Sequence, residues 1–557
     1  MSIYLKNKLL IIVLSVFLVK TTFSQQINFG DDYNFDKNIQ NDLEFKIFPD
    51  DQENVWKNIF KNKDYVEISN FFNNLPLNSR DEVVQNIIFD ILSSTKSFDK
   101  SMLSSDEFKK VFNLIVKNLF ITGRFNEIEI LYSQSPKLTN DSYILQKMIE
   151  GNLLRNRHSE ACKILEKNFN ENLVNLGKTM IMCNIINNRF EQAKLGLQLL
   201  KEQNNPGDIF FIELAFSLMM EKDSLNSKEL KKTLNQVKEL NPIIISSLQF
   251  ADISPSFEQI ESLSISGLLS LLSNPSVERE LKIYCAEILV KIGRIDVDML
   301  SDAYQLARFK QSEIEKANKL YKTLSPNRAR PLLFQSILRD EKLETKIDKI
   351  VSLVKVSQND NLVKQVSHLI DNSEEFSTSI KSHEASILIS KIYQSKGMYE
   401  EAKLSLKQNY KKPESDYRKI ALEMAELIYK PDRNYYELEN DLELIKSIEN
   451  QDSIFLKKLL MIMIMNLELD NNVVKNFRNM SISKEQKISG KDFKNLLLAE
   501  KLSRKKDFFN SISILFDIIG TQDFESLNLI ESYTILTILK NLELDSELKK
   551  FSQRMLL

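Results

Sequence analysis

The feature that most constrains the fold is a turn followed by an amphipathic helix, which recurs along the chain at nearly constant spacing. The clearest copies start their helices at Phe125, His158 and Phe190, which are 33 and 32 residues apart. Each start is preceded by Gly-Arg or Asn-Arg. Less regular copies begin at Tyr65, Tyr399 and Phe508. A period of this length is typical of proteins built from stacked helix pairs.

Composition agrees with stacked helices. The chain has 557 residues but only 11 Gly and 11 Pro, about 2% each against the usual ~7% and ~5%. Few turn-forming residues over such a length predict long helices joined by short loops. The length would otherwise suggest three or four compact domains, whereas a solenoid grows by stacking and needs no single large core. We therefore predict an all-α fold, an irregular α-α superhelical solenoid.

The recurring segments resemble tetratricopeptide repeats, whose period is 34 residues. In that family an aromatic residue opens the second helix of a pair, and a small residue three positions later lets the pair pack closely. The positions that the resemblance assigns to this packing are Phe125, His158, Ala161, Phe190, Ala193, Tyr399 and Ala402. Three copies depart from the pattern: Ile128 and Ile68 replace the small residue after Phe125 and Tyr65, and His158 replaces the aromatic.

The pattern also divides the chain. Residues 51–240 are predicted to form a first, tetratricopeptide-like array and residues 277–557 a second helical array. Between them, residues 241–276 combine Pro, Ser and short apolar runs, which is typical of a connector with packed turns. Residues 25–50 lack a sustained helical period and are predicted to be an extended lead-in. Trp56, the only tryptophan, follows this lead-in and is predicted to anchor packing.

The N-terminus predicts export. Residues 1–24 have a positively charged start, an apolar run at 9–19 and small residues before a cleavage site between Ser24 and Gln25. The apolar run is shorter than the ~20 residues that span a bilayer, although an uncleaved anchor is the alternative. No later apolar run reaches spanning length, so we predict no membrane span after signal removal and a periplasmic or secreted protein.

Charge argues against nucleic acid as a partner. The formal net charge is −2, and removal of residues 1–24, which hold three lysines and no acidic residue, would leave 72 basic against 77 acidic residues, or −5. The charges are evenly mixed, with no basic stripe to meet a phosphate backbone. We predict no nucleic-acid partner.

A second resemblance rests on Ala161 with Cys162, on Cys183, on the helix at 190–200 and on the run RPLLFQ at 330–335. This combination is similar to a family of uncharacterised exported alphaproteobacterial proteins. Some members carry an antifreeze-glycopeptide label, which implies Ala/Thr tripeptide repeats. The chain has no such repeats, so the label implies nothing about its function.

Two cysteines offer a covalent link. In a tetratricopeptide-like arrangement Cys162 lies early on a second helix and Cys183 late on the first helix of the next pair, and these helices pack together. Export exposes them to an oxidising compartment, so we predict a disulfide. The bond would close a loop of about 20 residues and contribute roughly 3 kcal/mol. The alternative is two buried thiols more than about 7 Å apart between Cα atoms. Cys285 is predicted to be an unpaired core residue.

Motifs for chemistry are absent from the sequence. His158, His368 and His383 show no metal-ligand spacing, and no phosphate-cradling loop or nucleophile motif occurs. We therefore predict no catalytic residue, no metal and no cofactor.

Some periplasmic lytic transglycosylases carry a long α-superhelical domain, so one enzyme class needs separate consideration. Their catalytic module uses a Glu in a Glu-Ser-Gly setting. Here the Glu-Ser pairs at 261–262 and 531–532 are followed by Leu and Tyr. The sequence thus predicts no glycosidase module.

The function that this organisation favours is non-catalytic. Stacked helix pairs form an extended concave surface, on which the first helices of successive pairs can bind a peptide segment. We expect a periplasmic scaffold or adaptor for an unidentified protein or peptide in the cell envelope. The alternative is a protein that binds an envelope polymer, peptidoglycan or polysaccharide, or assists a hydrolase. This expectation rests on analogy between folds.

Overall fold

The computed structural model describes residues 56, 59–93, 103–134, 141–168, 176–220, 227–370, 376, 380, 382–407, 413–429, 490–520 and 527–557. The predicted signal peptide, its cleavage site and the lead-in at 25–50 lie outside these residues. Within them every regular element is helical, so the fold is all-α. Among the same residues, no helix combines the length and the apolar character needed to cross a membrane.

The elements follow one another in short steps along the chain. The α-helices are α2 (Tyr65–Asn73), α3 (Glu82–Ser93), α4 (Ser105–Ile121), α5 (Phe125–Gln134), α6 (Ser142–Leu154), α7 (His158–Asn168), α8 (Gly177–Ile186), α9 (Phe190–Glu202), α10 (Ile209–Met219), α11 (Ser227–Leu234), α12 (Pro242–Phe250), α13 (Phe257–Glu261), α14 (Ile265–Ser273), α15 (Arg279–Lys291), α16 (Val297–Leu306), α17 (Gln311–Glu315), α18 (Ala317–Leu320), α19 (Pro326–Leu338), α20 (Leu343–Gln358), α21 (Val363–His368), α22 (His383–Ser395), α23 (Tyr399–Lys407), α24 (Pro413–Tyr429), α28 (Gly490–Arg504), α29 (Phe508–Ile519), α30 (Leu529–Asn541) and α31 (Asp545–Leu556). Two 3₁₀ turns, η5 (Pro206–Asp208) and η7 (Tyr321–Thr323), complete the set in this part of the chain.

Helix pairs are the repeating unit, and one kind of turn joins them. Packed pairs include α4 with α5, α6 with α7, α8 with α9 and α22 with α23. At each predicted turn one residue adopts a left-handed backbone with φ between 58° and 73°: Asn62, Gly123, Asn156, Asn188, Gly397 and Lys506. In the turn after α4, the Arg124 amide donates to the Leu119 carbonyl at 2.8 Å, the six-to-one bond of a Schellman motif. The recurring Gly and Asn therefore mark the chain positions where left-handed backbone ends one helix and starts the next.

The stretch predicted to be a connector, residues 241–276, differs from that prediction because it folds into α12, α13 and α14. Its Pro and Ser residues start helices. Pro242 occupies the first turn of α12, where a missing amide hydrogen costs nothing, and Asn241 caps that helix by accepting from the Ile244 amide at 3.0 Å. Ser264 caps α14 in the same way. The Pro, Asn and Ser residues that suggested turns therefore mark helix starts, and the helices of this stretch are part of the array.

Helices α12 and α14 pack on the first array. α12 contacts α6, α8 and α10, and α14 contacts α4 and α6. These partners are the first helices of successive pairs, the helices whose shared surface we predicted to hold a peptide. The chain therefore places two of its own helices on part of that surface.

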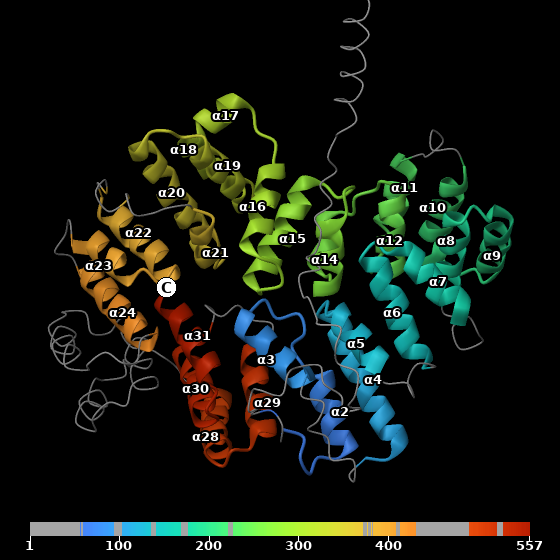
Figure 1. Cartoon of the computed structure of the whole chain (residues 1–557), viewed down its shortest axis with the longest axis horizontal. Helices are drawn as coiled ribbons and strands as arrows, with labels where there is room; N and C mark the ends of the chain where they lie inside the picture. The colour runs from blue at the N-terminus through green and yellow to red at the C-terminus, as the bar shows by residue number, and fades with distance from the viewer. Residues whose placement is uncertain are drawn as a thin grey trace, which may run out of the picture.

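The array closes on itself. From α15 the helices continue through α24, and α31 packs against both α24 and α3, so the end of the chain meets its beginning (Figure 1). Aromatic rings fill this contact. Trp56 meets Phe508 edge-on with ring centres 6.1 Å apart, and Phe71 meets Phe509 at 5.0 Å. The predicted packing anchor Trp56 is buried at this closure.

Three consecutive residues at the start of α3 join three distant parts of the chain: Arg80, Asp81 and Glu82. The first, an arginine, donates to the Tyr284 hydroxyl on α15 at 3.3 Å. The second, an aspartate, pairs with Arg554 on α31 at 2.5 Å. The third, a glutamate, pairs with Lys364 on α21 at 3.0 Å. The start of α3 is therefore the point where both arrays and the last helix meet.

Candidate functional site

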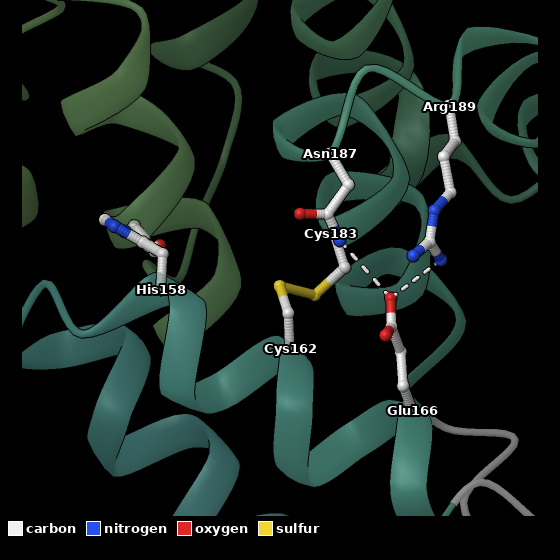
Figure 2. Close-up of a disulfide and its surroundings, with 7 residues drawn as sticks. His158, Cys162, Glu166, Cys183, Asn187 and Arg189 are labelled. Atoms are coloured by element: carbon white, nitrogen blue, oxygen red, sulfur yellow. Dashed lines mark hydrogen bonds and ion pairs between the residues drawn. A yellow bond between two sulfur atoms is a disulfide. The ribbon is translucent and has the colours of Figure 1, made fainter.

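The structure joins Cys162 and Cys183 by a disulfide, with their Cα atoms 5.5 Å apart (Figure 2). Cys162 lies one turn into α7, and Cys183 lies in the last turn of α8. Both are buried, so the bond holds two neighbouring pairs of the array together and is shielded from reductants. Cys285 is buried and free. Burial raises the pKa of its thiol to about 12, which makes it inert as a nucleophile.

Polar contacts flank the disulfide on its exposed side. The Glu166 carboxylate accepts from Arg189 Nη1 at 2.9 Å and from Asn187 Nδ2 at 3.3 Å (Figure 2). All three groups are surface-exposed to a considerable degree, so the pair contributes at most about 1 kcal/mol. The cluster links α7 to the turn after α8 and brings no group into position for chemistry.

His158, which opens α7, points away from the disulfide (Figure 2). Its Nε2 lies 2.8 Å from Ser246 Oγ, and its ring centre lies 4.4 Å from that of Phe250; both partners belong to α12. Burial lowers its pKa to about 4, so the imidazole is neutral at physiological pH. His158 is therefore a packing residue between the first array and α12.

All but one of the remaining repeat-packing positions are buried. Ala161, Ala193 and Ala402 have no exposed surface, and Phe125 and Tyr399 are buried. Phe190, in contrast, is 37% exposed and is less covered than the other positions of this set. The three alanines are fully buried because they face the paired helix. Phe190 opens α9, which lies at the edge of the array in this view (Figure 1).

Helix α9 exposes an apolar outer face. Ala193 and Leu197 face the core, whereas Leu195 and Leu199, two positions further on in each case, lie about 200° around the helix. Their exposed fractions are 59% and 55%. We call Leu195 and Leu199 the α9 outer face. It is an apolar surface without a partner among the described residues.

The RPLLFQ run supplies a buried ionic cluster inside the second array. Arg330 forms a two-bond pair with Glu287, at 2.7 and 2.6 Å, and reaches Asp360 at 2.5 Å. Tyr304 donates to Glu287 at 2.8 Å. Despite desolvation, these partners raise the pKa of Arg330, and burial raises that of Tyr304 well above its usual value. The cluster ties α15, α16, α19 and α20 together, and its charged groups already bind one another.

Asp90 is a perturbed carboxyl at the closure between α3 and α31. Burial, with the nearby charge of Glu547 as the second cause, raises its pKa to about 6. Lys550, Arg124 and a hydrogen bond from Trp56 act in the opposite direction and are outweighed. The closing contact therefore contains a carboxyl that titrates near neutrality.

The described residues do not assemble a metal centre, because no group of three His, Cys, Asp or Glu side chains converges within them. His368 Nδ1 lies 2.7 Å from the Lys364 carbonyl, one turn back on its own helix. His383 begins α22. The three histidines thus lie on separate helices and are not brought together.

Comparison with known proteins returned no counterpart: neither a protein-family model, nor a curated protein, nor a solved structure matches this chain.

Proposed function

We propose that the protein is an exported, non-catalytic scaffold of tetratricopeptide-like repeats, which binds a helix of a protein partner in the cell envelope. The observation that carries this proposal is the α9 outer face. Leu195 and Leu199 are one helical turn apart on a rigid helix and more than half exposed. Contiguous exposed apolar side chains on a folded protein mark interaction sites.

The chemistry of the surface favours a helix as its occupant. An i, i+4 leucine pair forms the kind of ridge that packs into the groove of another helix. Close helix packing already occurs beside this face: Gly196, on the flank of α9, lets that helix approach Ile181 of α8, and a Cβ at Gly196 would come within 2.7 Å of the isoleucine. A partner helix on the outer face would extend the same stacking by one layer.

The location differs from the concave surface expected for this kind of fold. Helices α12 and α14 lie on the first helices of the N-terminal pairs, so partner binding there would require their displacement. The outer face of α9 needs no such rearrangement. Sugar stacking on tryptophan, which an envelope-polymer binder would use, finds no support here because Trp56 is buried at the closure.

The test is affinity capture from envelope extract with matched variants. Wild type and Leu338→Glu, which changes a leucine of equal exposure (55%) at the end of α19, are expected to retain the same partner. The double variant Leu195→Glu/Leu199→Glu is expected to lose it. Equal recovery by all three proteins would contradict the proposal. Binding to purified sacculi with no protein recovered would favour the polymer reading.

A further inference from the structure

A buried arginine lies where α22, α24 and α31 meet. Arg418 extends from α24, and its Nε donates to Ser390 Oγ on α22 at 2.9 Å. Its Nη1 donates to the Leu556 carbonyl at the end of α31 at 2.7 Å. Its Nη2 is buried and has no hydrogen-bond partner. One arm of a fully charged guanidinium is therefore left unsatisfied inside the protein.

A second cation stands beside it. Lys391 follows Ser390 on α22 and is half-buried. Among the described residues neither Lys391 nor Arg418 pairs with a carboxylate, in contrast to the nearby Lys403, which contacts Glu426 at 2.7 Å. Burial, followed by the charge of Arg418, lowers the pKa of Lys391 to about 8, and burial lowers that of Arg418 to about 9. Two adjacent cations thus share one partly desolvated place without a counter-charge, which is costly unless an anion neutralises them.

A third polar group lies on the same side of α22 as Ser390. Gln394 lies one turn beyond Ser390 on the same face of α22. It is buried, and its Oε1 has no hydrogen-bond partner. A carboxamide can bind an oxyanion through its NH₂ group or a protonated one through its oxygen. Arg418 Nη2 and Gln394 Oε1, on two neighbouring helices, are therefore buried polar atoms without a hydrogen-bond partner.

We propose that Lys391, Gln394 and Arg418 form a binding site for a small oxyanion, phosphate or carboxylate, between α22 and α24. The two cations supply charge-assisted hydrogen bonds, and the free Nη2 arm of the guanidinium gives the anion a directed donor. Lys391 is the more exposed of the two cations, and Arg418 is buried. Because Arg418 also holds the end of α31, a bound anion stabilises the contact that closes the array. The site is separate from the α9 outer face and does not depend on partner binding.

The experiment measures thermal unfolding of the full chain in sodium phosphate, sodium acetate and sodium chloride at equal ionic strength and pH 7. Wild type is expected to melt at least about 2 °C higher in one of the oxyanions than in chloride. A rise in phosphate alone assigns the site to phosphate, and a rise in acetate as well assigns it to carboxylates too. Equal melting temperatures of the wild type in all three salts would overturn the proposal.

Variants tie the effect to this site. Lys391→Met keeps the aliphatic stem and is expected to abolish the oxyanion-dependent rise. Lys355→Met is the matched control and should retain the rise. It removes an exposed lysine of the neighbouring α20, which pairs with Glu384 of α22. A second readout on wild type avoids any folding defect: the oxyanion should slow reductive methylation of Lys391 at least about threefold, measured by peptide mass spectrometry, and leave Lys355 unchanged. A full thermal response in Lys391→Met, or equal methylation of Lys391 with and without oxyanion, would refute the assignment.

Discussion

Substitution of Gly123 tests whether α14 packs on the turn between α4 and α5. Gly123 has φ +70°, and a Cβ built on it would lie 2.5 Å from Leu269 Cδ1 and 3.5 Å from the Ser266 backbone, both in α14. Gly397 provides the matched control, because it occupies the same kind of turn with φ +73° and a Cβ there would meet nothing within 4 Å. The two glycines thus differ only in the helix that covers the turn.

The expected magnitudes follow from this difference. Alanine at either position must adopt a left-handed backbone, which costs about 1 kcal/mol. Gly123→Ala also forces Leu269 or the turn to move, which adds about 1–3 kcal/mol of overpacking strain. We therefore expect about 1 kcal/mol of destabilisation for Gly397→Ala and about 2–4 kcal/mol for Gly123→Ala.

Hydrogen exchange read by mass spectrometry is the suitable assay, because the cooperativity of unfolding breaks down in long repeat arrays and local opening can be followed peptide by peptide. Amides of residues 265–273 in α14 should exchange at least about fivefold faster in Gly123→Ala than in wild type, from the additional ~1 kcal/mol or more. They should be unaffected in Gly397→Ala. Equal effects of both variants on α14 would refute the packing of this helix on the turn.

Three further outcomes are expected. Alkylation of the unfolded, unreduced protein should label Cys285 alone, whereas three labelled thiols would contradict the disulfide. Because the pKa of Asp90 is raised from 3.8 to about 6, its contribution to stability is fully present below pH 4 and is lost as pH rises through 6; the loss is at most about 3 kcal/mol. Asp90→Asn should therefore unfold at higher denaturant concentration than wild type at pH 7 and flatten this pH dependence; an unchanged slope would exclude Asp90 as its source. Glu287→Gln should cost at most about 3–5 kcal/mol in chemical denaturation, because it removes the buried carboxylate that pairs with Arg330 and leaves only the partly exposed Asp360 to balance its charge; a cost below about 1 kcal/mol would contradict that pairing.

The turns were predictable because their cause is local. A left-handed residue is needed between paired helices, and Gly and Asn adopt that backbone most easily, so the sequence pattern marks them. Left-handed backbone with φ between 50° and 68° also occurs, unpredicted, at Asn204, Asp252, Gly293, Asn361 and Glu543. In the last of these an acidic residue adopts the left-handed conformation, which no residue-type preference would indicate.

The closure was not predictable because its contacts are not local. Asp81 and Arg554 are 473 positions apart in the chain, and Glu82 and Lys364 are 282 positions apart. An apolar helix face indicates that something covers it but not which helix does. For the same reason the sequence did not show that α12 and α14, in the stretch at 241–276, pack on the first array.

The candidate sites divide in the same way. The disulfide could be predicted because the repeat spacing places its two cysteines on neighbouring helices. No motif marks Arg418 or Lys391, because an isolated basic residue on a helix is most often solvated. Only the packing of α24 on α22 shows that these two cations share one place without an anion.

The most direct test of the closed array is zero-length carbodiimide cross-linking of the monomer, followed by peptide mass spectrometry. The Lys364 amine and the Glu82 carboxylate are 3.0 Å apart, so a peptide from α21 should be joined to one from the start of α3. The local pair Lys355 and Glu384, at 2.6 Å, serves as the internal control. The account predicts both cross-links in wild type and loss of the first alone in Lys364→Arg. The local cross-link without the long-range one in wild-type monomer would contradict closure of the chain on itself.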